Sequence, residues 1–148
     1  MSSLSAVIYR SRAVVPQADL DLFYLLAHAR RRNEVLDLSG LIVYDRGFFF
    51  QWLEGDNVSL GKVWNSIRRD TRHRDLVVLA DQPIPVRLFN DWHMQFAHRD
   101  HQHEALVDGF SIADPALLDD LHLNPEKTPN ILATFSTLGG GRSSLATA

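Results

Sequence analysis

The sequence predicts an α+β domain in which a ferredoxin-like β-α-β-β-α-β-β sheet carries two helices on one face, with short C-terminal helices added. Two observations lead to this prediction. Two segments repeat their apolar residues at helical spacing, and runs of strand-forming residues stand before, between and after them. The two runs between the helical segments are joined by a tight turn, which gives a hairpin. The resulting order of elements is that of a ferredoxin-like sheet followed by one further strand.

The first strand and the first helix are predicted within the N-terminal third of the chain. Ser5 to Tyr9 alternates weakly between polar and apolar residues, as a strand does. Asp19 can cap a helix that starts after Pro16. The apolar residues that follow keep the spacing of one helical face; they are Leu22, Leu25, Leu26 and Ala29. We expect this helix to end near Asn33.

A β-hairpin and a second helix follow. Residues 36–44 and 48–53 have the composition of strands, and Asp45-Arg46-Gly47 between them suits a tight turn. Glu54-Gly55-Asp56 interrupts the apolar run, so we expect the second of these strands to end there. Asp56 or Asn57 can cap the second helix. Its apolar face consists of Leu60, Val63, Trp64 and Ile67.

Two more strands and two short helices complete the prediction. Residues 76–80 form a fourth strand that Pro83-Ile84-Pro85 stops, and residues 92–96 form a fifth. Asp114 caps a helical stretch that reaches Leu123, and Pro125 and Pro129 bracket a turn. The last amphipathic stretch contains Ile131, Leu132, Phe135 and Leu138.

The predicted elements define three parts of the chain: a main domain, a helical extension and a tail. Helices this short are marginal alone, so we expect residues 100–138 to be an extension that covers the open sheet face or forms a dimer contact. Residues 1–99 are then the main domain. Residues 139–148, which open on three glycines, form a flexible tail.

Composition excludes several classes of protein. Hydrophobic residues make up 45% and charged residues 22% of the 148 residues, as in ordinary globular proteins. A net charge of −3 gives no field that attracts nucleic acid, and no apolar run is long enough to span a membrane. The absence of cysteine rules out disulfides, thiolate metal sites and cysteine nucleophiles. We therefore expect a cytoplasmic protein that binds neither nucleic acid nor membrane directly.

Gln51 is the most informative single residue. Its apolar neighbours predict that it is buried, and a buried carboxamide is costly unless its donors and its acceptor oxygen have partners. A core glutamine bonded to the backbone explains this residue by itself. A polar partner in the interior is favoured instead when Gln51 is considered together with Tyr9, Asn33, Trp92 and Met94.

Six segments between about Leu4 and Arg99 carry a family resemblance. They are Ile8-Tyr9-Arg10-Ser11-Arg12, Arg32-Asn33, Ser39-Gly40-Leu41-Ile42-Val43-Tyr44, the run 49–55, Asp70-Thr71-Arg72-His73-Arg74-Asp75 and Asp91-Trp92-His93-Met94. In these segments and their order, the chain resembles the BLUF domains, which are blue-light sensors that use FAD. The lack of cysteine excludes the other common small flavin photosensor, the LOV type, whose photochemistry adds a cysteine sulfur to the flavin.

The resemblance implies a photochemical mechanism without an enzymatic output. Tyr9 would give an electron to a photoexcited, non-covalently bound FAD, and a proton would follow along the carboxamide of Gln51. The carboxamide would then flip or tautomerise and leave changed hydrogen bonds around the flavin. Trp92 and Met94 would relay this change to the fifth strand. Simple core packing is the alternative for these two residues.

The resemblance also implies a set of cofactor contacts, with FAD between the helices of residues 19–33 and 57–70. The set is Tyr9, Arg32, Asn33, Gln51, Ile67, Arg72 and His73. Asn33 would bind the polar edge of the ring and Ile67 would form an apolar wall. A helix C-cap is the alternative for Asn33. Most of the basic residues near the two helix ends suit the helix dipoles and solubility equally well.

The partner of this photoreceptor is expected to be a separate downstream protein, because the 49 residues after Arg99 are too few for an ordinary output domain. A homo-oligomer is also expected. Two other functions stay open: a cofactor-free ferredoxin-like interaction module, and a small flavin oxidoreductase, although no nicotinamide fingerprint is present. His98, His101 and His103 match no metal-ligand spacing, so we expect no metal site.

Overall fold

The computed structural model describes residues 3–14, 22–90, 92–98 and 110–138. The predicted helix cap Asp19, together with His101, His103 and the predicted tail 139–148, lies outside the described residues. The strands are β1 (Leu4–Ala13), β2 (Ser39–Asp45), β3 (Phe48–Asp56), β4 (His73–Pro83), β5 (Gln95–His98) and β6 (Phe110–Ile112). The helices are α1 (Leu22–Leu36), α2 (Asn57–Arg69), α3 (Pro115–Leu123) and α4 (Thr128–Leu138), with a 3-10 turn at Pro125–Lys127.

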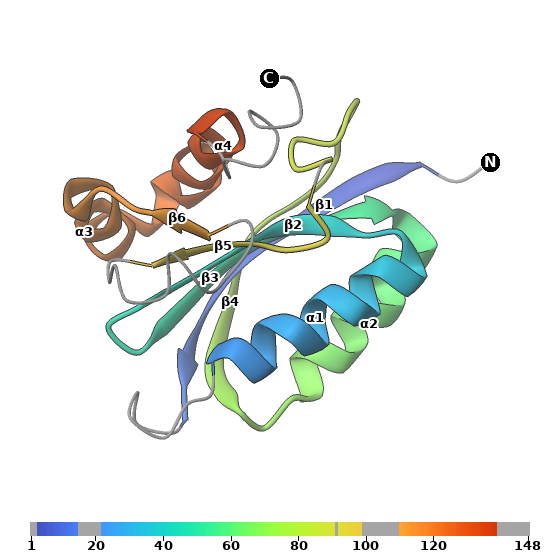
Figure 1. The fold of residues 1–148 in the computed structure, drawn as a ribbon, viewed down its shortest axis with the longest axis horizontal. Coiled ribbons are helices and arrows are strands. Elements are labelled where there is room, and N and C mark those ends of the chain that lie inside the picture. Colours follow the sequence, from blue (N-terminus) through green and yellow to red (C-terminus); the bar gives the residue numbers. More distant parts are fainter. Residues whose placement is uncertain (1–2, 15–21, 91, 99–109, 139–148) are drawn as a thin grey trace.

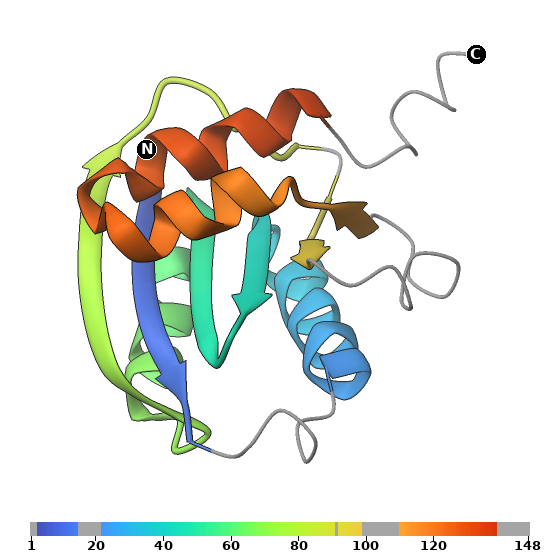
Figure 2. The same cartoon turned by 90° about the vertical axis from the view of Figure 1, so that its left-hand side faces the viewer.

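The strands form one sheet in the order β4-β1-β3-β2-β5-β6 (Figures 1 and 2). The first four are antiparallel in the ferredoxin-like order, which confirms the predicted fold class. β5 and β6 then add in parallel to β2. β6 was not predicted, because its three residues follow a polar stretch and carry no pattern of their own.

α1 is longer than the sequence predicts, since it continues past Asn33 to Leu36. Asp37 then adopts the left-handed conformation, with φ of 54°. The N–H of Leu38 donates to the Asn33 carbonyl at 2.8 Å, and the N–H of Asp37 donates to the Glu34 carbonyl at 3.4 Å. This is a Schellman ending, in which Asp37 takes the left-handed position that the alternative interpretation gave to Asn33.

The hairpin has the predicted turn but a longer second strand. Arg46 and Gly47 have φ values of 50° and 84°, as a two-residue turn requires when it matches the twist of the strands. β3 does not stop at Leu53, because Gly55 and Asp56 still pair with β1. A Cβ at Gly55 would lie 2.3 Å from Leu38 Cδ2, so a larger residue would force the buried Leu38 side chain to shift where β3 passes the end of α1.

Asp56 ends β3 and also caps α2. Its carboxylate accepts from the N–H groups of Val58 at 3.1 Å and Ser59 at 3.2 Å, which decides between the two predicted caps. Leu60, Val63 and Ile67 on this helix are buried against the sheet.

β4 is an edge strand that starts earlier than predicted, at His73, and ends at Pro83 as the proline predicts. β5 starts only at Gln95, so the prediction that Trp92 and Met94 lie on this strand was wrong. The chain turns before the strand begins, with the N–H of Trp92 donating to the Phe89 carbonyl at 3.0 Å.

Two cores lie on the two faces of the sheet. On one face, α1 and α2 pack against inward residues of β1 and β3 such as Val7 and Leu53. On the other face, α3 and α4 cover the sheet, and Leu118 and Leu132 pack in one cluster with Ile8 and Phe50 (Figure 2). Asp114 caps α3, since its carboxylate accepts from the Ala116 N–H at 2.9 Å. None of the helices in the described ranges is long and apolar enough to cross a membrane.

Candidate functional site

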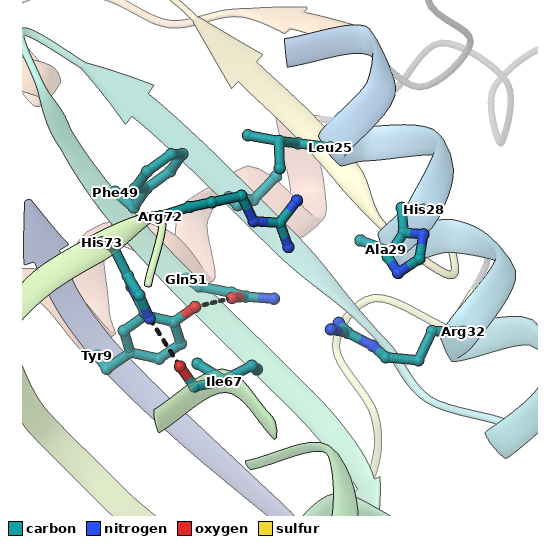
Figure 3. Close-up of a pocket in the computed structure, with 11 residues that line it drawn as sticks. Tyr9, Leu25, His28, Ala29, Arg32, Phe49, Gln51, Ile67, Arg72 and His73 are labelled. Carbon is teal, nitrogen blue, oxygen red and sulfur yellow. Dashed lines mark hydrogen bonds between the residues drawn. The ribbon is translucent and has the colours of Figure 1, made fainter. Parts of the chain in front are cut away.

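A pocket of about 550 Å³, including its open mouth, lies between α1 and α2 above the sheet (Figure 3). The lining residues are Tyr9, Leu25, His28, Ala29, Arg32, Ile42, Phe49, Gln51, Ile67, Arg72 and His73. The pocket thus has apolar walls with a few polar groups placed among them.

The floor of the pocket is one row of residues across three strands. Tyr9 on β1 pairs with Gln51 on β3, and Gln51 pairs with Ile42 on β2. Residues paired across strands point to the same face of a sheet, and residues two apart on one strand also share a face. Phe49 therefore joins the row beside Gln51.

Gln51 is buried and links the phenol to a thioether. Tyr9 donates its hydroxyl proton to Gln51 Oε1 in a buried hydrogen bond. On the other side of the carboxamide, Gln51 Nε2 lies 3.9 Å from the sulfur of Met94. The oxygen of Gln51 therefore has a good hydrogen-bond donor in Tyr9. Because a thioether is only a weak acceptor, the N–H groups of Gln51 can still donate to a stronger partner.

Burial raises the pKa of Tyr9 well above its ordinary value, and the negative charge of Asp70 acts in the same direction. The nearby Arg32 guanidinium opposes this rise, but desolvation is the largest effect. The phenol is therefore fully protonated at neutral pH. Its ring packs against Trp64, with the ring centres 5.4 Å apart, and near His73.

Arg32 reaches the pocket from α1. Its Nε donates to Asn33 Oδ1 at 3.1 Å, and its two terminal nitrogens make no hydrogen bond with any described residue. Burial lowers the pKa of Arg32. Asn33 itself is fully buried and does not line the pocket. Its Nδ2 donates to the His93 carbonyl at 2.6 Å, so Asn33 joins α1 to the segment that precedes β5.

Arg72 and His73 form the opposite side, where α2 passes into β4. Arg72 makes a bidentate pair with Asp70, in which Nε donates to Oδ1 at 3.0 Å and Nη2 donates to Oδ2 at 2.6 Å. This pair lowers the pKa of Asp70 and raises that of Arg72. His73 Nε2 lies 2.7 Å from the Ile67 carbonyl oxygen, and Nδ1 lies 2.7 Å from Ser11 Oγ. Because a carbonyl only accepts, Nε2 carries the proton, which fixes the orientation of the ring.

The two predicted relay residues lie at different places. Met94 is fully buried and contacts Gln51, as described above. Trp92 is also buried, but its ring lies beneath the guanidinium of Arg30, at 5.9 Å from ring centre to Cζ. Arg30 Nε also donates to the Met94 carbonyl at 2.8 Å, so this arginine connects α1 to both relay residues.

The structure brings all of the predicted cofactor contacts except Asn33 into the wall of this pocket. Sequence reasoning missed five lining residues, namely Leu25, His28, Ala29, Ile42 and Phe49. Their positions did carry a signal. Phe49 is two residues from Gln51 on one strand, and the α1 members keep helical spacing to Arg32. Arg30 was missed because its basic neighbours suggested a solvated helix end.

Comparison with known proteins identifies the type of site. The family model described as sensors of blue light using FAD matches residues 4–95. The photoactivated adenylate cyclase subunit beta of Euglena gracilis is 33% identical over 102 residues, which are 67% of this chain but only 12% of that protein. The chain therefore spans about an eighth of the length of this curated relative.

Solved structures show the same fold. The dark-state structure of BlrB, a BLUF protein, matches with a TM-score of 0.73 and 26% identity over 90% of this chain and 95% of that chain. Klebsiella pneumoniae BlrP1 with FMN and cyclic diGMP matches with a TM-score of 0.65 and 29% identity, over 84% of this chain and 36% of that one. A pocket between two helices on a ferredoxin-like sheet, with a phenol and a carboxamide in its floor, is thus that of a flavin-based light sensor. The chain belongs to the BLUF family.

Proposed function

We propose that this protein is a blue-light photoreceptor that binds FAD non-covalently in the pocket between α1 and α2. The observation that carries the proposal is the continuous contact from Tyr9 and Gln51 on the pocket floor to the buried Met94 behind them. It joins the oxidisable phenol of Tyr9 to the carboxamide of Gln51, which has a donor end and an acceptor end. The carboxamide in turn contacts the buried thioether of Met94, which directly precedes β5.

The residues present fit a flavin. Ile67 and Leu25 offer apolar surfaces on the two helices, suited to the two faces of a flat ring. The underused N–H groups of Gln51 and the terminal nitrogens of Arg32 are donors suited to the oxygen and nitrogen atoms of a flavin ring. When bound, the flavin supplies absorption of blue light and, once excited, the capacity to accept an electron.

Tyr9 is the proposed electron donor. Because its pKa is raised, the phenol is neutral in the dark and must release a proton when it loses an electron. An oxidised phenol is a far stronger acid than a neutral one, and Gln51 Oε1 is already the acceptor of its hydrogen bond. The proton therefore moves from Tyr9 Oη to Gln51 Oε1.

Gln51 turns this proton movement into a lasting change. A carboxamide that gains a proton on oxygen can release one from nitrogen to a bound flavin, which would also hold the electron from Tyr9. Alternatively, the carboxamide can rotate and exchange its two ends. Either change alters what Gln51 presents to Met94, whose flexible thioether can move in response. Arg30 bonds the Met94 carbonyl and lies over Trp92, so displacement of Met94 reaches the start of β5.

The displacement at the start of β5 is proposed to act on a separate protein, and the chain itself is proposed to catalyse no reaction. We also propose that the protein forms a homo-oligomer. The Euglena relatives are named as adenylate cyclase subunits, and they are much longer than this chain. This supports a sensory role in which the effector lies outside residues 1–148.

An absorption spectrum before and after blue light tests the proposal. The purified protein should be yellow, and its flavin band should shift slightly to the red on illumination and revert in the dark. Tyr9→Phe and Gln51→Leu should each abolish the shift. Tyr44→Phe is the matched control, because it removes a phenol oxygen from another buried tyrosine of the same sheet.

Three results would contradict this assignment. A normal photocycle in either variant would remove the roles of Tyr9 and Gln51. Colourless protein after addition of FAD would favour the cofactor-free interaction module. Steady oxidation of reduced nicotinamide in the dark would favour a flavin oxidoreductase.

A further inference from the structure

Two aromatic side chains on α1 stand at the mouth of the pocket without a role in the photochemistry proposed above. Tyr24 and His28 are one helical turn apart, and their rings are stacked with centres 5.9 Å apart and planes at 19°. His28 lines the pocket, and Tyr24 lies farther out, with 60% of its surface exposed.

A guanidinium group lies on the other side of the pocket, that of Arg72, which is paired with the carboxylate of Asp70. Arg72 lines the pocket opposite α1 and extends towards the space between the helices (Figure 3). Tyr24 is close enough to Arg72 to contribute to the raised pKa of that guanidinium. The stacked pair and Arg72 therefore face the same opening from its two sides.

This arrangement bears on the length of the ligand. A flavin ring seated over Gln51 needs only the inner residues of the pocket, and the rest of the molecule must leave through the mouth. In a flavin dinucleotide that remainder is a diphosphate followed by an adenine, whereas in a mononucleotide it ends at one phosphate. Guanidinium groups suit phosphates, and flat aromatic side chains stack on nucleobases.

We infer that the Tyr24–His28 pair is a binding subsite for the adenine of a flavin dinucleotide, with Arg72 beside the diphosphate. The inference rests on the proposed function, because it concerns the outer half of the same ligand. It adds a reason why this chain selects FAD over FMN. An aromatic pair one turn apart also supports a helix by itself, and a binding experiment separates the two roles.

The experiment compares ligands that differ only in their outer half. The full chain, freed of flavin, is titrated with riboflavin, FMN and FAD in the dark, and the dissociation constants are measured by calorimetry. The wild-type protein should bind FAD roughly tenfold more tightly than FMN, the factor expected from stacking of one base on an aromatic side chain. Tyr24→Ala should remove most of this preference and leave riboflavin binding unchanged.

Two further variants control for the substitution. Tyr24→Phe keeps the ring and should retain the preference for FAD. Val35→Ala changes another exposed residue of α1, 78% exposed and outside the pocket lining, and should match the wild-type protein with all three ligands.

The possible results are distinct. Equal affinity of the wild-type protein for FAD and FMN would overturn the adenine subsite while leaving the photoreceptor intact, and so would an equal loss of riboflavin and FAD binding in Tyr24→Ala. Failure of the wild-type protein to bind any of the three flavins would overturn the proposed function and the subsite together.

Discussion

Replacing Glu54 by glutamine should weaken the fold at the point where the sheet holds the segment that leads to Trp92 and Met94. Glu54 is fully buried and accepts hydrogen bonds at both carboxylate oxygens. Oε1 accepts from Trp52 Nε1 at 2.9 Å and from the Leu88 N–H at 2.9 Å. Oε2 accepts from Ser39 Oγ at 2.7 Å and from the Phe89 N–H at 2.8 Å.

The magnitude follows from this geometry. All four partners of Glu54 donate, so an NH₂ group at either end of the side chain meets N–H donors. The Oε2 end is the better place for the NH₂ group, because the Ser39 hydroxyl can turn and accept, which leaves only the Phe89 N–H without its partner. The bonds at the other end lose the charge that strengthens them. With about 1.5–3 kcal/mol for a hydrogen bond to a charged group, the combined loss should be about 2–4 kcal/mol.

Thermal unfolding followed by circular dichroism measures this loss. For a chain of this size, about 2–4 kcal/mol corresponds to a fall in Tm of roughly 5–15 °C. Asp81→Asn is the matched control, since Asp81 is an exposed acidic residue on the edge strand and should change stability by less than about 0.5 kcal/mol. The dark recovery of Glu54→Gln should also change, because Leu88 and Phe89 precede the relay residues. A Tm within 2 °C of the wild-type value, taken as roughly the effect of a surface change, would refute the reasoning.

Two other substitutions test the site and the C-terminal helices. The raised pKa of Tyr9 means that the folded protein holds this proton when the unfolded chain releases it. Stability from this source is therefore complete below about pH 10 and declines as the pH rises further. Tyr9→Phe should lose stability less steeply than the wild-type protein above that pH in urea titrations, and equal slopes would contradict the assigned burial effect. Leu132→Ala should cost about 2–5 kcal/mol, because this α4 side chain is fully buried against the sheet. Leu123→Ala, which removes an α3 leucine that is 77% exposed, should stay close to wild type, and an equally small change in Leu132→Ala would mean that α4 does not cover the sheet as described.

Local patterns in the sequence were sufficient for much of the fold. The turn at Arg46-Gly47 and the caps Asp56 and Asp114 depend on residues within a few positions of each other; the turn and Asp114 were predicted, and Asp56 was one of two predicted caps. The element boundaries that were wrong depend on distant residues. β3 continues to Asp56 because β1 pairs with it, and β5 begins at Gln95, where its pairing with Leu41 of β2 begins.

The sequence by itself determined that Tyr9 and Gln51 lie on strands, and the two-residue period of a strand implies that Gln51 and Phe49 share a face, although the sequence did not single out Phe49 as a site residue. Only the tertiary structure decided that Tyr9 stands opposite Gln51, because strand register depends on pairing between segments 42 residues apart. It likewise placed Asn33 behind Arg32 and set Met94 rather than Trp92 against the carboxamide. Periodicity specifies which face of an element is buried, whereas the neighbour that a buried side chain meets is set by the packing of the whole domain.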